Sequence, residues 1–233
     1  MNSERKFDEF DEFANNYRNI HNKNIEITGV NSEYFSEHKI NILANHQKNQ
    51  SFKFLDFGCG DGNSSVYFRK YFPSAAYIGF DISEKSIEVA KNRGIPNATF
   101  SHFDGTNIPL EDNSIDIIFT ACVFHHINFD KHDEIMNEIY RVLKPNGKFY
   151  IFEHNPWNPI TQRIVSTCPF DVDAILLKPN YTIKLFKKSN FTEVHKNFIL
   201  FFPRTNIFKP LLKFEKYFTK LPLGGQYYVV GSK

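Results

Sequence analysis

A glycine-rich segment, residues 56–62, constrains this chain more than any other feature, and it reads DFGCGDG. It follows apolar residues typical of a buried strand, and it precedes a segment, 64–72, with apolar residues at helical spacing. A strand, a glycine loop and a helix together open a nucleotide-binding βαβ unit. Glycines permit a sharp turn and let the backbone approach a ligand closely. The N-terminus of the next helix favours a carboxylate or a phosphate. We therefore predict an α/β fold that holds a ligand at this loop.

Composition limits the classes of protein to consider. The 233 residues carry 28 basic and 26 acidic side chains, a balance that disfavours a dedicated nucleic-acid binder. The three cysteines show no pattern typical of zinc sites or disulfides, which favours a reducing cytoplasm. The charged N-terminus does not resemble a signal peptide, and no apolar run is long enough to span a bilayer. We expect one cytoplasmic domain, monomeric or homodimeric, without a metal ion or a nucleic-acid partner.

Two acidic residues end neighbouring predicted strands. The predicted strand 76–81 ends at Asp81, about twenty residues beyond the glycines, where nucleotide-binding folds place a carboxylate for the ribose hydroxyls. The alternative role for Asp81 is a helix N-cap, which Ser83 could also provide. The predicted strand 98–103 is followed by Asp104, whose alternative role is an Asx turn. The apolar run 115–121 predicts a strand that is buried on both faces.

These features, together with residues 141–153 (RVLKPNGKFYIFE), make the sequence resemble the class I S-adenosylmethionine (SAM) methyltransferases. The resemblance covers about residues 50–202 and the last strand. It implies a Rossmann-like, doubly wound, seven-stranded, mostly parallel sheet with an antiparallel C-terminal hairpin strand and an N-terminal helical lid. The whole chain, 1–233, would then be one domain. Its expected parts are a lid (1–48), a core (50–202 and 226–233) and an inserted cap (203–225).

The resemblance implies SAM as the cofactor and S-adenosylhomocysteine as its product. It places the adenine amino group on Asp104, the ring face on Phe103, and an aromatic side chain of the lid, Tyr17, against the cofactor. The full set of implied cofactor-binding residues is Tyr17, Asp56, Gly58, Cys59, Gly60, Asp81, Ile82, Phe103, Asp104, Gly105, Thr120 and Ala121.

Four residues at the ends of the fourth and fifth predicted strands are candidates for catalysis: His125, His126, Glu153 and His154. An oxygen acceptor of high pKa needs a group that removes its proton, and histidines and carboxylates do this commonly. The alternatives are that the histidines pack structurally and that Glu153 hydrogen-bonds the neighbouring loop. The sequence shows no cluster of aspartates of the kind expected for a magnesium site.

The acceptor is less constrained. Residues 153–177 form a Pro-, Trp- and Asp-containing loop expected to shape the acceptor pocket, and they are similar to a stretch in bacterial methyltransferases of surface-polysaccharide pathways. We therefore predict O-methylation of a sugar or glycan precursor. The alternatives are N- or C-methylation of another small metabolite or of a quinone or lipid precursor, an NAD-dependent dehydrogenase, and a SAM-binding protein without catalysis.

The insertion carries a basic amphipathic stretch, predicted as a helix over 210–220. Its apolar side is expected to pack on the domain, with the lysines in water. The alternative is peripheral contact of residues 206–220 with a membrane surface or with a phosphate-bearing substrate.

Overall fold

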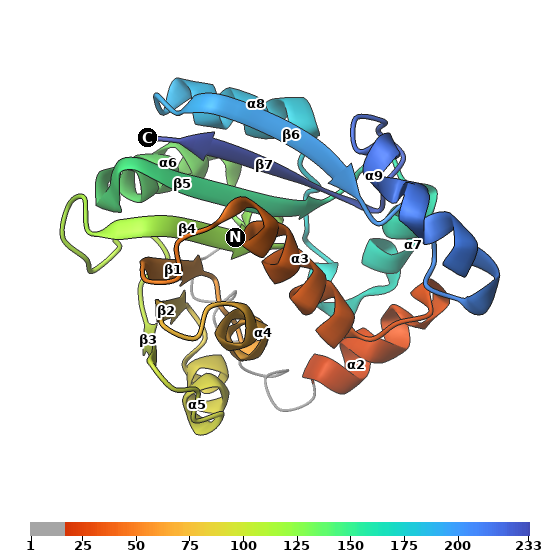
Figure 1. Cartoon of the computed structure of the whole chain (residues 1–233), viewed down its shortest axis with the longest axis horizontal. Coiled ribbons are helices and arrows are strands. Elements are labelled where there is room, and N and C mark those ends of the chain that lie inside the picture. Colours follow the sequence, from red (N-terminus) through yellow and green to blue (C-terminus); the bar gives the residue numbers. More distant parts are fainter. Residues whose placement is uncertain (1–16) are drawn as a thin grey trace.

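The computed structural model describes residues 17–233, and its framework is a seven-stranded sheet (Figure 1). The strand order is β3-β2-β1-β4-β5-β7-β6, in which β7 runs antiparallel to both of its neighbours and the pairs among β1–β5 are parallel. The order reverses between β1 and β4, so a crevice opens there at the carboxyl ends of the strands. The strands are β1 (Lys53–Phe57), β2 (Ala76–Asp81), β3 (Ala98–His102), β4 (Ile115–Ala121), β5 (Leu143–His154), β6 (Thr192–Ile199) and β7 (Gln226–Ser232).

Helices cover both faces of this sheet (Figure 1). Apolar side chains of α3, α4 and α5 pack on one face, and those of α6 and α8 pack on the other. The α-helices are α2 (Tyr17–Asn24), α3 (Ser32–His46), α4 (Asn63–Tyr71), α5 (Glu84–Asn92), α6 (His132–Val142), α7 (Pro159–Thr167), α8 (Pro179–Lys188) and α9 (Glu215–Phe218). The 3-10 helices are η1 (Glu26–Thr28), η2 (Phe124–His126), η3 (Phe129–Lys131), η4 (Pro169–Asp171) and η5 (Asn206–Phe214).

Phenylalanine dominates both apolar layers. On one face Phe54 of β1 meets Phe68 of α4 with ring centroids 4.3 Å apart, and on the other Phe149 of β5 stacks on Phe186 of α8 at 5.1 Å. All four rings are fully buried, and each such side chain contributes about 1.5–3 kcal/mol to folding. Because both faces are covered by helices, the carboxyl edge of the sheet is where a ligand can enter.

Several sequence-based predictions are confirmed. The strands expected at 76–81, 115–121 and 226–232 have these bounds, and the sheet is mostly parallel with an antiparallel C-terminal pair. Ser83 caps α5, since its hydroxyl accepts the backbone N–H of Ser86 at 3.1 Å. Asn190, just beyond α8, adopts φ +63°, as expected for an asparagine that ends a helix.

Other predictions were wrong in detail. The polar residues 21–35 predict an irregular segment, but they contain the end of α2, all of η1 and the start of α3. The run Lys-Pro-Asn-Gly at 144–147 predicts a turn, but it lies within β5, because Leu143 already pairs with Ile115 of β4. The helix expected over 210–220 is divided into η5 and the short α9, and Pro210, which has no N–H to donate, lies inside η5. Aromatic residues at three- and four-residue intervals over 7–17 also predict a helix, which lies outside the described residues apart from the backbone of Tyr17.

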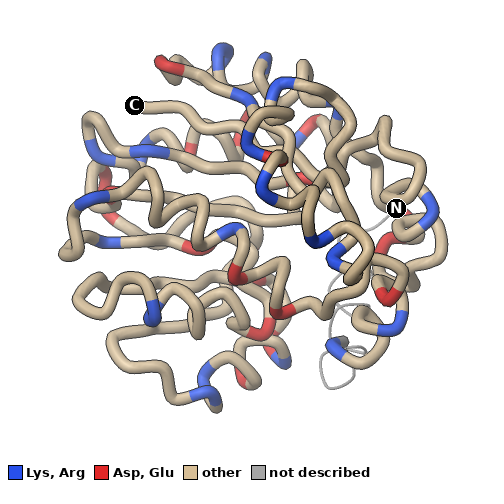
Figure 2. The backbone as a smooth tube through the Cα atoms, turned by 45° about the vertical axis from the view of Figure 1, so that its right-hand side comes forward, with Lys and Arg blue, Asp and Glu red and all other residues tan. Residues whose placement is uncertain are grey.

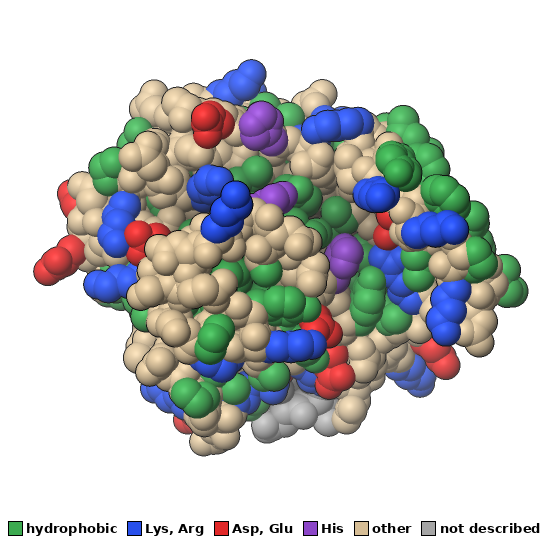
Figure 3. Space-filling model, in the orientation of Figure 1, with side chains coloured by type: hydrophobic (Ala, Val, Ile, Leu, Met, Phe, Trp, Pro, Cys, Tyr) green, Lys and Arg blue, Asp and Glu red, His purple; other side chains and the backbone are tan. Residues whose placement is uncertain are grey.

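The surface carries both signs of charge, spread over the elements (Figure 2). Hydrophobic and basic side chains lie side by side over residues 203–225, on the right of Figure 3. Part of this insertion packs as the sequence predicted, because Phe218 makes edge contacts with Phe201 and Phe202. Within residues 17–233, none of the helices has the length and the apolar content needed to cross a bilayer.

Candidate active site

One cavity of about 520 Å³ opens at the carboxyl ends of β1, β2, β4 and β5. Its volume is typical of small-molecule sites. Of the twelve predicted cofactor-binding residues, ten line it; Thr120 does not, and the side chain of Tyr17 lies outside what the structure describes. Thr120 is instead fully buried within β4. The same cavity is lined by His125, His126 and His154. The structure thus brings the two predicted halves of the site into one space.

The glycine loop has two packing positions and one open position. A Cβ on Gly58 would lie 2.5 Å from Val123 Cγ2, and a Cβ on Gly62 would lie 2.9 Å from that of Ala90. At Gly60 a Cβ would meet nothing within 4 Å, although its φ of +53° is left-handed. The loop therefore leaves room for a ligand at Gly60.

Asp81 is held by backbone groups. Its Oδ2 accepts the N–H of Gly60 at 2.7 Å, and its Oδ1 accepts that of Ser83 at 2.9 Å. Burial raises the pKa of Asp81, and the hydrogen bonds from Ser83 and Gly60 oppose this shift in part. A carboxylate oxygen can accept a second hydrogen bond. Asp81 is therefore oriented and still able to accept hydrogen bonds from ribose hydroxyls. Ser83 caps α5, the role that was considered as the alternative for Asp81.

The two residues predicted to bind adenine, Phe103 and Asp104, differ in their surroundings. The ring of Phe103 is buried edge-on to Phe57, with centroids 5.3 Å apart. The exposed Asp104 accepts the backbone N–H groups of Thr106 and Asn107, both at 2.7 Å, and the Asn107 side-chain amide at 2.7 Å. Burial would raise the pKa of Asp104, but these hydrogen bonds outweigh it and lower that pKa. The Asx turn considered as the alternative is present, and adenine recognition by Asp104 stays a prediction.

Asp56 and Cys59 are more enclosed than the prediction implies. Asp56 is buried and accepts a hydrogen bond from the Tyr77 hydroxyl, and burial raises the pKa of its carboxyl to about 7. Burial also raises the pKa of the Cys59 thiol well above its ordinary value. Both side chains are buried beside the loop. Direct contact of either with a cofactor stays a prediction.

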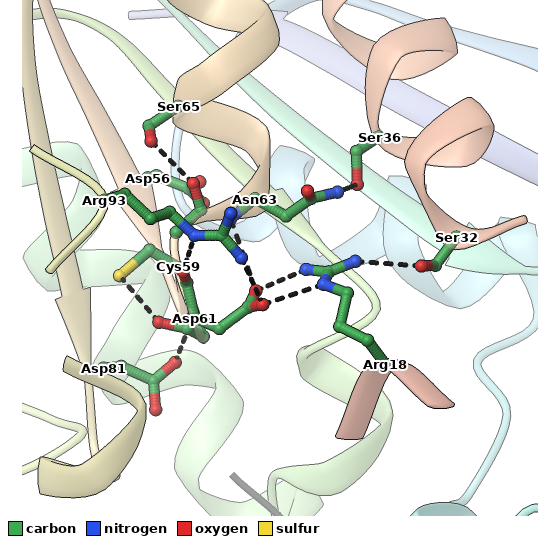
Figure 4. A network of polar contacts seen from close by, with 12 residues as sticks. Arg18, Ser32, Ser36, Asp56, Cys59, Asp61, Asn63, Ser65, Asp81 and Arg93 are labelled. Atoms are coloured by element: carbon green, nitrogen blue, oxygen red, sulfur yellow. Dashed lines mark hydrogen bonds and ion pairs between the residues drawn. The ribbon is translucent and has the colours of Figure 1, made fainter. Parts of the chain in front are cut away.

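Asp61, inside the glycine loop, was not predicted as a site residue (Figure 4). Arg18 of α2 donates through Nε to its Oδ2 at 2.8 Å, and Arg93 donates through Nη2 at 2.6 Å. Arg18 also donates to Ser32 Oγ at 3.0 Å. Burial would raise the pKa of Asp61, but the two guanidinium groups outweigh it and lower that pKa. This network ties the N-terminal helices to the loop.

The other end of the cavity is built from side chains. Glu153, at the end of β5, is fully buried; its Oε1 accepts the Phe124 N–H at 3.0 Å, and its Oε2 lies 2.5 Å from His125 Nδ1. His125 Nε2 faces Asp171 Oδ1 at 3.6 Å, and His126 Nε2 lies 3.4 Å from the same oxygen. Asp171, in η4, belongs to the stretch predicted to shape the pocket but was not itself predicted.

A second cluster at this end centres on Cys122. Its Sγ accepts hydrogen bonds from Lys39 Nζ and Gln226 Nε2, both at 3.7 Å. Burial would raise the pKa of the thiol, but the charges of His154 and Lys39 outweigh it and lower that pKa to about 7. Burial lowers the pKa of His154, yet the thiolate outweighs it and the net shift is upward. Of these residues the sequence predicted His154 alone.

The protonation states separate the four catalytic candidates. Burial disfavours an imidazolium at His125, but Glu153 and Asp171 together outweigh it and raise the pKa of His125 to about 10. The pKa of His126 is lowered by burial and by the charge of His125. His125 is therefore protonated at neutral pH and unable to accept a proton. Glu153 is fully buried and does not line the cavity, and its contact with the site is its hydrogen bond to His125.

The comparisons with known proteins agree with this geometry. Residues 55–151 match the model of a family described as a methyltransferase domain. Over this segment the chain is similar to methyltransferases. The matched part runs from the end of β1, through the glycine loop, to most of β5, so the similarity covers elements that form the cavity.

Curated relatives of this chain are similar over the same part. An uncharacterized methyltransferase, YcgJ, of Bacillus subtilis is 31% identical over 117 residues, which are 48% of this chain and 45% of that protein. The demethylmenaquinone methyltransferase of Lactobacillus johnsonii is 36% identical over 113 residues, 46% of either chain. The chain thus spans about half the length of the curated relatives that it matches. A SAM-dependent methyltransferase of Thermotoga maritima has the same fold at 17% identity, with a TM-score of 0.68 over 98% of this chain and 99% of that one.

The residues that line the cavity fit SAM. The open position at Gly60 leaves space, Asp81 retains acceptor capacity, and the buried ring of Phe103 offers an apolar contact. These three features occur at the carboxyl ends of β1, β2 and β3, where an adenosine would span neighbouring strands.

Proposed function

We propose that this chain transfers a methyl group from SAM to a small-molecule acceptor held in the same cavity. The observation that carries the proposal is the continuity of one cavity from the glycine loop to the cluster of titratable side chains. SAM, when bound, supplies a methyl group already activated on a sulfonium. The protein then has to orient two molecules and exclude water, which are the main contributions to such a displacement.

The lid assignment belongs to this proposal. Residues 17–48 would cover the cofactor, since His21, Ile25 and Lys39 line the cavity and Arg18 holds α2 to the glycine loop. In the same scheme, residues 50–202 and 226–233 form the core and residues 203–225 form a cap. Arg204 supports the last part, because its Nε donates to the Tyr34 hydroxyl of α3 at 2.6 Å.

A hydroxyl acceptor would have to lose its proton. An efficient general base has a pKa near the working pH. The Cys122–His154 pair meets this condition, because the Cys122 pKa is about 7 and both residues line the cavity. We therefore assign proton removal to this pair, and we assign to Glu153 the positioning of His125.

Two acceptor classes follow from the supporting observations. The sequence favours oxygen of a sugar or glycan precursor. The lining at the acceptor end, with Ile27, Ile164 and Phe201, favours an acceptor with an apolar ring or chain, such as a quinone or lipid precursor. The demethylmenaquinone methyltransferase among the relatives supports the second class. Formation of S-adenosylhomocysteine with nucleotide sugars and, separately, with hydroxylated quinones and phenols would distinguish the two classes.

The change Asp81→Ala tests the cofactor site. Loss of charge-assisted hydrogen bonds to the ribose should weaken SAM binding by about 1.5–3 kcal/mol, or roughly 10- to 150-fold, measured by calorimetry. Asp173→Ala, at an exposed aspartate, is the control and should bind SAM normally. Equal SAM affinity in the Asp81 variant would remove this residue from the site. Tight binding of NADH in place of SAM would favour the dehydrogenase, and SAM binding without turnover would favour a non-catalytic binding protein.

A further inference from the structure

Two histidines and one aspartate from separate segments converge at the acceptor end of the cavity. We propose that His125, His126 and Asp171 bind one divalent transition-metal ion. Their donor atoms all lie within 4.8 Å of one another, and Asp171 Oδ1 is 3.6 Å from His125 Nε2 and 3.4 Å from His126 Nε2. Ligands of a tetrahedral zinc ion at about 2.0–2.1 Å are separated by about 3.3–3.5 Å. The side chains are thus spaced as a metal site requires.

Glu153 supplies the support that metal-binding histidines commonly have. Its Oε2 accepts the His125 Nδ1–H at 2.5 Å, and its other oxygen is fixed by the backbone N–H of Phe124. A carboxylate on one imidazole nitrogen fixes the ring and directs the lone pair of the other nitrogen to the metal. Here the other nitrogen, Nε2, faces Asp171.

An ordinary ion pair does not explain this arrangement. The 3.6 Å separation of His125 Nε2 and Asp171 Oδ1 is longer than a hydrogen bond. His125 is only 2% exposed, and its Nε2 has no hydrogen-bond partner among residues 17–233. A buried polar atom without a partner is costly, and native structures avoid it. A metal ion between the two side chains would satisfy both atoms.

The charges around the site also favour a cation. Glu153 and Asp171 place two carboxylates on either side of one imidazole, and Glu153 is fully buried. Buried charges normally have a counter-charge or coordinate a metal. A dication would displace the proton from His125 Nε2, leave the two histidines neutral and balance both carboxylates.

The donor set indicates the class of ion. Two imidazoles and one carboxylate suit zinc, cobalt or iron(II), whereas calcium and magnesium prefer oxygen ligands. Three protein ligands leave a coordination position open, and all three residues line the cavity. An acceptor oxygen bound there would have a lowered pKa. This last role rests on the proposed methyl transfer, but metal binding itself does not. The sequence predicted no metal, because 45 positions separate His126 from Asp171 and no ligand spacing is visible.

The test uses the full chain, first treated with EDTA and then titrated with ZnCl₂ by calorimetry and with CoCl₂ by visible absorption. We expect one equivalent of either ion to bind, with the ligand-field bands of four- or five-coordinate cobalt. His126→Ala and Asp171→Asn should each weaken binding at least 100-fold. His195→Ala and Asp173→Asn, at exposed positions, are matched controls and should bind as the unchanged chain does. Thermal unfolding shows whether each variant is folded.

Equal zinc affinity in the unchanged chain and in both folded ligand variants would overturn the proposal, as would the absence of a stoichiometric site. If either ligand variant does not fold, the cobalt spectrum of the unchanged chain decides: a spectrum identical to that of cobalt in buffer overturns the site. SAM titrations run in parallel separate this outcome from the proposed function. Zinc binding without SAM binding would support the metal site and contradict the methyltransferase proposal. SAM binding without zinc binding would support the cofactor site and contradict the metal site.

Discussion

The two ends of the cavity are constructed in different ways. At the cofactor end the backbone forms the site: left-handed glycines follow β1, and Asp81 is fixed by the N–H groups of Gly60 and Ser83. At the acceptor end side chains form the site, and burial and neighbouring charges shift the pKa values of several of them, such as His125 and Cys122. One end has its polar groups paired, while at the other His125 Nε2 and Gln226 Oε1 are buried without hydrogen-bond partners among the described residues.

This difference indicates where each end gets its properties. A backbone site needs the conformation of one short stretch and depends little on its neighbours. A side-chain site depends on the burial and charge of each member, so it can be tuned to one acceptor but is sensitive to substitution. Changes at the acceptor end should therefore cost stability and change protonation, whereas changes at the cofactor end should mainly affect binding.

The largest effect is expected for Glu153→Gln. The change removes a fully buried charge that holds both His125 and the N–H of Phe124. Breaking a buried ionic pair typically costs 3–5 kcal/mol, so we expect the free energy of unfolding in urea to fall by about 3 kcal/mol. Glu138→Gln, at a partly exposed partner of Arg141, is the control and should cost at most about 1 kcal/mol. Equal losses in the two variants would show that the acceptor end does not depend on its buried charges.

The cofactor end can be tested with two glycines in nearly the same conformation. Gly60 and Gly94 have φ of +53° and +61°, and a Cβ on either meets nothing within 4 Å. An alanine at either position should therefore carry the same left-handed strain, about 1–2 kcal/mol. Only Gly60 lines the cavity. We expect Gly60→Ala to weaken SAM binding at least tenfold and Gly94→Ala to leave it unchanged, by calorimetry.

A similar loss of SAM affinity in both glycine variants would mean that backbone strain, and not the added methyl group, is responsible. No loss in either variant would mean that the cofactor does not approach Gly60. Either result would contradict the view that the glycine loop leaves its space for a ligand.

The same contrast explains what could be predicted from the sequence. Gly58, Gly60 and Asp81 follow from local rules, because a glycine loop between a strand and a helix needs few neighbours to define its shape. The sheet follows equally, since its strands are strongly apolar runs with clear ends. Asp171 and Gln226 could not be predicted as site residues, because the contact of η4 with η2 and the pairing of β7 with β5 bring them to the cavity.

Asp61 is an intermediate case. It lies inside the recognised motif, so its position near the cofactor could have been noted. Its partners, Arg18 and Arg93, come from α2 and from the end of α5, and no local pattern links them to the loop. Sequence reasoning is therefore reliable for structures that one segment forms alone. It is poor for contacts that bring three separate segments together.

The smallest expected effect is a change in the reactivity of Cys122, measured in EDTA so that no metal competes. The thiolate is the reactive form, so alkylation by iodoacetamide should rise with pH around the Cys122 pKa of about 7. Cys59 and Cys168 are internal controls in the same digest, because burial raises the pKa of both, that of Cys168 to about 12. Below pH 7 the protonated thiol should react slowly, and above it the rate should level off.

His154→Gln then tests the origin of that shift. His154 is the largest contribution that lowers the Cys122 pKa, so its removal should move the alkylation midpoint upward, by about one unit, toward the ordinary value near 8.5. Lys39→Met should move the midpoint in the same direction by less, because Lys39 contributes less. A midpoint unchanged by His154→Gln would mean that the two groups do not share a proton, and the acceptor end would then lose its proposed base while the backbone-built cofactor end would be unaffected.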